Sequence, residues 1–273
     1  MISSSVDISI IIINYNTFQL TCNCIRSIKE KTIGCTFEII LVDNASTETD
    51  PDNFLKMFPE ITLVKSESNM GFAKGNNAGI AHAQGEFILL LNSDTELKND
   101  AISICKKFLV KHPSVGVVSA RLEYDDGRVQ NNCQRFPAAK YKMFELLRLQ
   151  KLLPKRLGGK VLLGFFFDHR QVVYPDWVWG TFFMFRKQQL QLLPQQKLAD
   201  EFFMYVEDMQ WCMEFMKLGY LVAFEPAAEV IHHMGKSGGA RSSLMEKNMA
   251  IFMNRYYSSF SRVIIRILDK LLG

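Results

Sequence analysis

A short, strongly apolar run of the chain is followed by three polar residues, the last of which could bind a metal ion. Phe87–Leu91 contains no polar residue, and Asn92, Ser93 and Asp94 come directly after it. Such a run predicts a strand buried on both faces. At the carboxyl edge of a parallel sheet, side chains after a strand point into the crevice where ligands bind. The Asp94 carboxylate would then suit Mg²⁺ or Mn²⁺, ions that usually also bind substrate phosphates. An ordinary turn after a strand is the structural alternative.

Polar side chains also follow two other predicted strands. Ile8–Ile13 and Phe37–Val42 are nearly all apolar, which predicts two more buried strands. Asn14 and Asn16 follow the first of them, and Asp43 follows the second. Chain order places all three polar clusters at one edge of the sheet. An aspartate there can accept a hydrogen bond from the imide N–H of a uracil or thymine base.

A stretch rich in glycine and asparagine, Asn69–Gly79, leads into a predicted helix that ends near Gly85. Gly71 and Gly75 could let the backbone approach a ligand closely, and the amino terminus of the following helix favours anions. Turn geometry and helix packing are the alternative for both glycines. The spacing matches neither GxGxxG nor the P-loop pattern, so it indicates neither a Rossmann dinucleotide site nor a P-loop.

Strands and helices alternate through the first half of the chain, where Thr17–Lys31 and Pro51–Phe58 are predicted helices and Ile61–Val64 is a third strand. This order predicts right-handed β-α-β units and a parallel sheet. The net charge of +4 is too small to indicate nucleic-acid binding. Six scattered cysteines without a CxxC pair indicate neither a zinc site nor a disulfide framework, which favours the reducing cytoplasm. Neither a signal peptide nor a membrane-spanning helix is expected.

Four motifs together resemble the family 2 glycosyltransferases, in particular their bacterial rhamnosyltransferase-like group. They are Ile10–Asn16, Val42–Ser46, Asn69–Asn76 and Leu91–Asp94. The resemblance implies a GT-A fold, an α/β architecture with a mostly parallel central sheet flanked by helices. It implies a nucleotide-sugar donor, with Asp43 at the base and Asp94 holding Mg²⁺ or Mn²⁺ under the diphosphate. The donor-site residues that it implies are Asn14, Asn16, Asp43, Asn69, Gly71, Asn76, Asn92 and Ser93. Asn92 stands where the motif has its first acid, so metal binding depends mainly on Asp94.

A Glu-Asp pair in the second half is the candidate for proton transfer. Glu207 and Asp208 open a helix predicted over Met209–Leu218. Acids at a helix amino terminus are stabilised by the helix dipole, which is the structural alternative. In the family the matching aspartate is the general base, so the resemblance assigns that role to Asp208 and places Glu207 at the acceptor site. The family often has an aspartate and an arginine at the positions of Gln210 and Glu214, so the acceptor is left open.

The segment Trp177–Arg186 is predicted as one strand that contains a glycine. Glycine in a strand often marks the close approach of a ligand or another backbone. The resemblance places Trp179, Gly180 and Thr181 beside the acceptor, and a role in the core is the alternative.

The segment Glu229–Ser237 resembles the family's His-x-x-Gly-x-Ser sequence. This resemblance makes His232 a further contact of the metal or diphosphate and His233 the second choice, whereas a lone histidine is more often a core residue. Lys236 and Arg241 could close over phosphates or lie in a solvated loop.

The tail 258–272 alternates basic and apolar residues. Arg262, Arg266 and Lys270 are four residues apart, so on a helix they share one face while the rest is apolar. Such a helix could lie in an anionic membrane surface, cap the core or form an oligomer contact. The segment 141–167 is also apolar and basic; core or acceptor lining is favoured there over a partner surface or a membrane-facing element.

Together with these patterns, the family resemblance implies an inverting, metal-dependent glycosyltransferase of surface polysaccharide synthesis, in three parts. Residues 1–135 form the nucleotide-sugar-binding half, 136–242 the acceptor-binding and catalytic half of the same domain, and 243–273 an amphipathic tail. The expected partners are a UDP- or dTDP-linked sugar, a glycan or polyprenyl-diphosphate-linked acceptor and no nucleic acid. We expect a cytoplasmic protein whose tail contacts the inner face of the membrane. A non-catalytic nucleotide-sugar-binding scaffold is the alternative, and a nucleotidyltransferase would need a basic, glycine-rich loop that Asn14–Thr17 does not provide.

Overall fold

The computed structural model describes residues 6–233 and 241–272. Its strands are β1 (Ile8–Asn14), β2 (Phe37–Asp43), β3 (Thr62–Lys65), β4 (Phe87–Asn92), β5 (Thr95–Leu97), β6 (Val115–Glu123), β7 (Cys133–Gln134), β8 (Trp177–Val178), β9 (Phe182–Arg186) and β10 (Leu221–His232). Its α-helices are α1 (Phe18–Lys31), α2 (Asp52–Met57), α3 (Gly71–Ile80), α4 (Ala101–Lys111), α5 (Ala139–Leu146), α6 (Lys155–Leu162), α7 (Glu207–Lys217), α8 (Arg241–Tyr256) and α9 (Ser259–Leu272).

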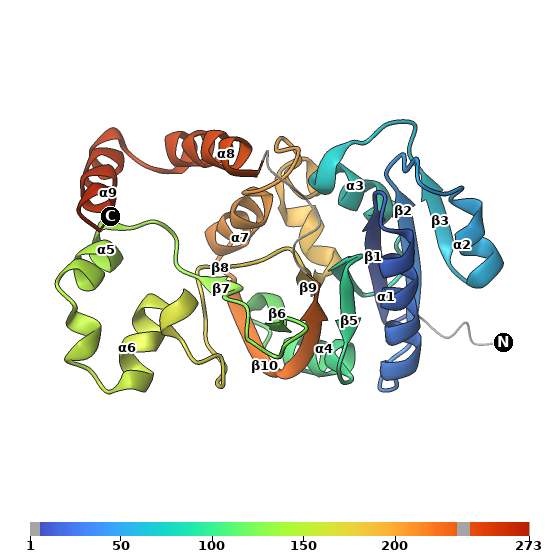
Figure 1. Cartoon of the computed structure of the whole chain (residues 1–273), viewed down its shortest axis with the longest axis horizontal. Helices are drawn as coiled ribbons and strands as arrows, with labels where there is room; N and C mark the ends of the chain where they lie inside the picture. The colour runs from blue at the N-terminus through green and yellow to red at the C-terminus, as the bar shows by residue number, and fades with distance from the viewer. Residues whose placement is uncertain (1–5, 234–240, 273) are drawn as a thin grey trace.

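Eight of the strands form one sheet in the order β3-β2-β1-β4-β9-β6-β10-β5, with helices on both faces (Figure 1). The first four strands are parallel, as is the pair β6 and β10. Strand β9 is antiparallel to both of its neighbours, and β5 is antiparallel to β10. The predicted mostly parallel sheet is therefore confirmed, and strands from both halves of the chain build it.

The uninterrupted apolar runs are explained by burial on both faces of the sheet. Ile10 and Leu89 pack into a core cluster with side chains of α1, α2 and α4. Their neighbours Ile11 and Leu90 point the other way, into a cluster with α3, α7 and α8. Since successive side chains of a strand alternate between faces, a strand covered on both sides needs apolar residues at every position.

The prediction of one strand over Trp177–Arg186 is wrong. Strand β8 pairs with β7 in a separate two-stranded sheet, whereas β9 lies between β4 and β6 in the main sheet. Gly180 and Thr181 form the turn at which the chain passes from one sheet to the other. A Cβ on Gly180 would lie 3.0 Å from the ring of Phe72, so close packing from α3 accompanies this change of direction.

Two further expectations differ from the structure. Helix α3 begins at Gly71 and ends at Ile80, earlier than the helix predicted to end near Gly85. The segment 141–167 lines the core only in part: Leu163 and Phe167 are buried, but large apolar side chains between α5 and the end of α6 are exposed. Apolarity alone does not show which side chains other elements will cover.

Candidate active site

The carboxyl ends of β1, β2 and β4 meet at one edge of the sheet. Asn14 lies opposite Asp43 in the β1–β2 register, and Ile13 lies opposite Asn92 in the β1–β4 register. The three polar clusters that chain order places at this edge are therefore neighbours in the structure.

Asn14 is the centre of a hydrogen-bond network at this edge. Its buried Nδ2 donates to Asp43 Oδ1 at 2.8 Å and to Ser46 Oγ at 2.9 Å. Its Oδ1 accepts from the hydroxyls of Thr17 at 3.1 Å and Thr21 at 2.9 Å. The backbone N–H of Ser46 donates to the second oxygen of Asp43 at 3.1 Å. The network fixes the orientation of the Asp43 carboxylate, whose contact with a base stays a prediction.

Two other predicted donor-site residues shape the loops around this edge. Asn16 adopts φ 53°, a left-handed conformation that asparagine tolerates, and its Oδ1 accepts from two backbone N–H groups of the 47–48 turn. Asn69 Oδ1 accepts from Asn44 Nδ2 and from the backbone of Gly71, both at 2.9 Å. Asn44 was given no role of its own by sequence reasoning, although it holds this loop in place.

Gly71 and Asn76 have roles within the protein itself. Gly71 has φ +80°, and a Cβ there would lie 2.2 Å from the carbonyl oxygen of Phe203. The close approach expected at Gly71 is thus made by the protein's own backbone, whereas a Cβ on Gly75 would lie 3.2 Å from the side chain of Ile13. Asn76 is buried in α3, where its Nδ2 donates to a carbonyl of that helix at 3.0 Å.

Asp94 and His232, the two predicted metal ligands, lie next to each other. His232 Nε2 lies 3.4 Å from Asp94 Oδ1. The buried Gln130 orients the imidazole: its Nε2 donates to the His232 carbonyl at 2.8 Å, and its Oε1 lies 2.7 Å from Nδ1. Because Oε1 can only accept, Nδ1 carries the proton, and Nε2 is the ring nitrogen that faces Asp94 and that a cation bound beside this carboxylate would contact. Sequence reasoning did not find Gln130.

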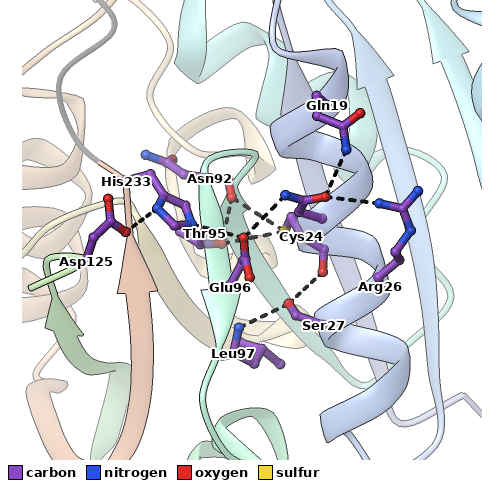
Figure 2. Close-up of polar contacts among 11 residues, drawn as sticks. Gln19, Cys24, Arg26, Ser27, Asn92, Thr95, Glu96, Leu97, Asp125 and His233 are labelled. Atoms are coloured by element: carbon purple, nitrogen blue, oxygen red, sulfur yellow. Dashed lines mark hydrogen bonds and ion pairs between the residues drawn. The ribbon is translucent and has the colours of Figure 1, made fainter. Parts of the chain in front are cut away.

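His233 is engaged by other side chains. Figure 2 shows its ring between Asp125 and Glu96: Nδ1 pairs with Asp125, and Nε2 lies 3.1 Å from Glu96 Oε1. Both ring nitrogens pair with carboxylates other than Asp94, which leaves the preceding histidine as the better partner of Asp94 in a metal site. The same view shows the backbone carbonyl of Asn92 accepting from the Thr95 hydroxyl at 2.8 Å, a bond that fixes the turn after β4.

A second group of acidic residues, besides Asp94, lies at the start of α7. It contains Asp208, in the first turn of the helix. Its Oδ2 accepts from the backbone N–H of Gly180 at 3.1 Å, and its Oδ1 accepts from Met209 N–H at 2.8 Å. Burial raises the pKa of Asp208 to about 6, against the opposing effect of these two N–H donors. A carboxylate with a pKa near neutrality is still charged at pH 7 and is a stronger base than an ordinary aspartate.

The residues around Asp208 are strained and partly unsatisfied. Tyr205 and Val206 have φ of 70° and 78°, a rare conformation for non-glycine residues that is often found at functional sites. Glu207 is buried, and its Oε2 has no hydrogen-bond partner among the described residues. Burial, and then the charge of Asp208, raise the pKa of Glu207 well above its usual range.

The Gly180–Thr181 turn joins the two centres. The Thr181 carbonyl accepts from the backbone N–H of Asn92 at 3.0 Å, while the Gly180 N–H binds Asp208. Trp179 is partly buried against the core cluster. Gly180 and Thr181, two of the three residues expected at the acceptor, therefore lie between the metal-ligand candidates and the base candidate, and Trp179 directly precedes them. Ser93 contacts the Thr17 hydroxyl at 3.0 Å on the donor side.

A sequence profile described as "Glycosyl transferase family 2" matches residues 9–172, more than half of the chain. The chain belongs to glycosyl transferase family 2. It is 22% identical over 256 residues to the N-acetylglucosaminyl-diphospho-decaprenol L-rhamnosyltransferase of Mycobacterium tuberculosis, covering 84% of this chain and 78% of that protein. It is 26% identical to the uncharacterized protein y4gI of Sinorhizobium fredii, covering 85% of this chain but spanning only 25% of that protein.

The same fold occurs in a solved glycosyltransferase. The crystal structure of GalNAc-T7 with UDP, GalNAc and Mn²⁺ matches with a TM-score of 0.65 at 14% identity, over 91% of this chain and 48% of that one. The sheet and its helices therefore form a GT-A fold, as the sequence predicts. Within 6–233 and 241–272, no helix is long and apolar enough to cross a membrane.

The donor set of this family 2 chain fits a divalent ion. It offers the Asp94 carboxylate, the Nε2 lone pair of His232 and the buried Oδ1 of Asn92, which has no hydrogen-bond partner in the described part of the chain. No group of three or more His, Cys, Asp or Glu side chains in that part could hold a metal by itself. A small number of protein ligands is sufficient when oxygen atoms of the substrate phosphates complete the coordination of the ion. The imidazole ligand favours Mn²⁺ over Mg²⁺. Lys236 and the side chain of Arg241 lie outside what the structure describes.

Proposed function

We propose that this protein transfers a sugar from a UDP- or dTDP-linked donor to a hydroxyl group, with inversion at the anomeric carbon. One observation carries the proposal: Asp208, with a pKa of about 6, lies across the Gly180–Thr181 turn from Asp94 and His232. A base and a candidate site for the leaving diphosphate are what a direct displacement requires.

The chain's own residues account for the proton. Asp208 accepts it from the acceptor hydroxyl as that oxygen bonds to the anomeric carbon. The bond from the same carbon to the diphosphate oxygen breaks, and one displacement inverts the configuration. The N–H groups of Gly180 and Met209 hold the carboxylate in place for this transfer. General-base assistance contributes about 10² to 10⁴ in rate.

The donor would lie at the carboxyl edge of β1, β2 and β4. Asp43 would accept from the imide N–H of the base. Asp94 and His232 would hold a Mn²⁺ or Mg²⁺ ion, whose charge stabilises the leaving diphosphate when it is bound. The UDP and Mn²⁺ in the GalNAc-T7 structure support this class of donor and ion.

The acceptor we propose is a glycan or a polyprenyl-diphosphate-linked sugar at the inner face of the cytoplasmic membrane. The mycobacterial relative is named for transfer of rhamnose to N-acetylglucosaminyl-diphospho-decaprenol, and this name supports the proposed acceptor class. Residues 136–242 would bind the acceptor and 1–135 the donor, while 258–272 would contact the membrane.

Thermal unfolding with UDP, TDP, GDP and CDP, each with and without Mn²⁺, tests the donor site. A nucleotide at 100 times its dissociation constant stabilises by about 2.7 kcal/mol, enough to shift the midpoint measurably. We expect a Mn²⁺-dependent shift with UDP or TDP that Asp94→Ala loses and that Asp126→Ala, at the exposed hairpin tip, keeps. No shift with any nucleotide would contradict the proposed donor class. A UDP or TDP shift in a protein that lacks transferase activity would favour the non-catalytic scaffold.

A further inference from the structure

The positive charge of the chain is concentrated in two segments. Residues 139–166 contain seven lysines and arginines and one glutamate, and 259–272 contain three basic residues and one aspartate. These segments carry a net charge of +8, so the rest of the chain carries −4 of the total of +4. Such an asymmetry creates a local positive field although the whole chain is nearly neutral.

The two segments lie together in space. Figure 1 shows α5, α6 and α9 at one end of the molecule, opposite the end that carries α2 and β3. Helices α5 and α9 contact each other, and Lys142 pairs with Asp269 between them. One of the two acids in this end is therefore already neutralised by an ion pair.

Helix α9 has more apolar surface than the protein covers. Ile265 and Leu268 are buried on its inner side. A second apolar stripe, at positions i, i+3, i+7 and i+11, is exposed and consists of Phe260, Val263, Ile267 and Leu271. At 3.6 residues per turn, Arg266 and Lys270 flank this stripe on one side. Long basic side chains beside an exposed apolar stripe are typical of a helix that lies in a membrane interface.

The segment 139–166, which contacts α9 through α5, also carries exposed apolar side chains. Eleven of the 25 exposed large hydrophobic residues in the described parts of the chain lie in 139–166 and 259–272. Those in the first segment are Met143, Leu147, Leu152, Leu153, Leu157 and Phe165. Leu152 is 80% exposed and Phe165 71%, so neither is held in the core. A patch of this kind marks an interaction site rather than ordinary surface.

We propose that α5, α6 and α9 together form an interfacial docking surface, which binds an anionic lipid bilayer. The exposed apolar side chains would enter the interface, and the basic residues would contact anionic headgroups. The surface thus has two parts, of which the tail 258–272 is only one. The proposal rests on the proposed function only for its purpose, which is to bring the active site to a lipid-linked acceptor.

The docking surface is connected to the base by α8. Asn248 Nδ2 on this helix donates to the carbonyls of Met204 at 2.8 Å and Tyr205 at 3.1 Å, shortly before Asp208. Helix α8 is followed directly by α9. A bilayer bound at α9 would therefore lie on the side of the molecule from which α8 reaches Met204 and Tyr205, the segment shortly before Asp208.

Vesicle flotation of the full chain without nucleotide tests the proposal. We expect binding to vesicles of phosphatidylcholine and phosphatidylglycerol at 7:3, and much weaker binding to pure phosphatidylcholine. Phe260→Ser/Ile267→Ser in the tail and Leu152→Ser/Phe165→Ser in the other segment should each weaken binding about tenfold or more. The matched control Ile33→Ser/Val110→Ser changes two equally exposed apolar residues elsewhere and should bind like the unmodified chain.

The charges are tested separately. Arg266→Gln/Lys270→Gln should lower vesicle affinity about 25-fold, because each basic residue near an anionic surface contributes about a fivefold change. The control Lys107→Gln/Lys111→Gln, on exposed positions of α4, should leave binding unchanged.

Three results would overturn the proposal: no vesicle binding, equal binding to neutral vesicles, or loss of binding in the controls as well. Sedimentation that shows a dimer broken by the same tail variants would assign the surface to a second copy instead. The nucleotide-dependent thermal shift of these variants should be unchanged, so failure of docking and failure of the donor site are distinguished.

Discussion

At the scale of single residues, the environment of Asp208 determines the expected pH dependence. We expect Asp208→Asn to lose turnover by about 10² to 10⁴ while nucleotide binding is kept, since the amide cannot take the proton. In the unmodified chain, turnover should fall as the pH is lowered through about 6, where burial places the pKa of this carboxyl. Single-turnover rates from pH 5 to 8 measure the loss in Asp208→Asn and the pH dependence of the unmodified chain. Glu201→Gln, on an exposed acid of the preceding loop, is the control, and transfer retained in Asp208→Asn would remove Asp208 from the mechanism.

The Gln130–His232 pair gives a second prediction at this scale. Gln130→Leu removes the acceptor of the Nδ1 proton, so the imidazole can change tautomer or rotate. We expect the affinity for Mn²⁺, measured by electron paramagnetic resonance with UDP present, to fall about 10- to 100-fold. Gln130→Glu keeps the acceptor for Nδ1 but loses the donor to the His232 carbonyl, so its Mn²⁺ affinity should lie between those of the unmodified chain and Gln130→Leu.

A purely structural role of Gln130 would give a different result. Both variants would then lower the unfolding midpoint without separating in Mn²⁺ affinity. Gln134→Leu, which also removes an amide hydrogen bond to a backbone carbonyl, serves as the control for general destabilisation.

The residues that sequence reasoning missed share a physical reason. Gln130 acts on a residue 102 positions away, and Asn44 holds a loop 25 positions away. No local pattern records such contacts, because they exist only once the strands have paired. Asp94, Asp208 and His232 could be proposed as site residues because each stands at the end of a strand or the start of a helix within a recognisable motif. Only the structure shows that Gly180 and Thr181 connect the segment of Asp94 with Asp208.

At the scale of elements, the start of α3 depends on the absence of a side chain at Gly71. Gly71→Ala would place a Cβ 2.2 Å from the Phe203 carbonyl and would keep φ at +80°. We expect a loss in the free energy of unfolding of about 3 kcal/mol or more, measured by urea titration. Gly127 has φ +79° with nothing within 4 Å of an added Cβ, so Gly127→Ala should cost only about 1–2 kcal/mol. Equal losses in the two variants would show that conformation, and not close approach, limits this position.

Elements with both faces buried were predictable, and those set by distant partners were not. The runs in β1, β2 and β4 predict strands because every position faces a core cluster. The segment Trp177–Arg186 is equally apolar, yet its first residues pair with β7 and its last with β4 and β6. Partner choice is a tertiary property, so apolarity alone suggested one strand where there are two.

At the scale of the whole molecule, a few buried groups determine how stability depends on pH. Burial raises the pKa of Glu207, Asp208 and Glu214. All three acids lie on α7, where Asp208 and Glu214 are less than two helical turns apart. Burial lowers the pKa of His169. The acids hold their protons in the folded state at a pH where the unfolded chain has lost them. Their contribution to stability is therefore present at low pH and is lost as the pH rises through the folded-state values.

His169 acts in the opposite direction. Below its ordinary pKa of 6.5, this histidine binds a proton more readily in the unfolded chain than in the folded protein, which lowers stability at low pH. One histidine opposes three acids, so we expect the urea midpoint to increase as the pH is lowered from about 7 to about 5, across the pKa of about 6 that burial gives Asp208. Each proton taken up contributes up to about 1.4 kcal/mol per pH unit. Glu207→Gln/Asp208→Asn should flatten this dependence, whereas Asp126→Asn at the exposed hairpin tip should not. A midpoint that falls over this range would contradict the assignment.

Two of the three acids that give this stability dependence, Glu207 and Asp208, lie at the proposed active site. Lowering the pH from about 8 to below 6 should therefore make the protein more stable and less active at once, because protonation of Asp208 relieves a buried charge and removes the base. Measuring turnover and urea midpoint on the same pH series tests this link. If activity and stability declined together, the pH dependence of activity would reflect unfolding and not the ionisation of Asp208.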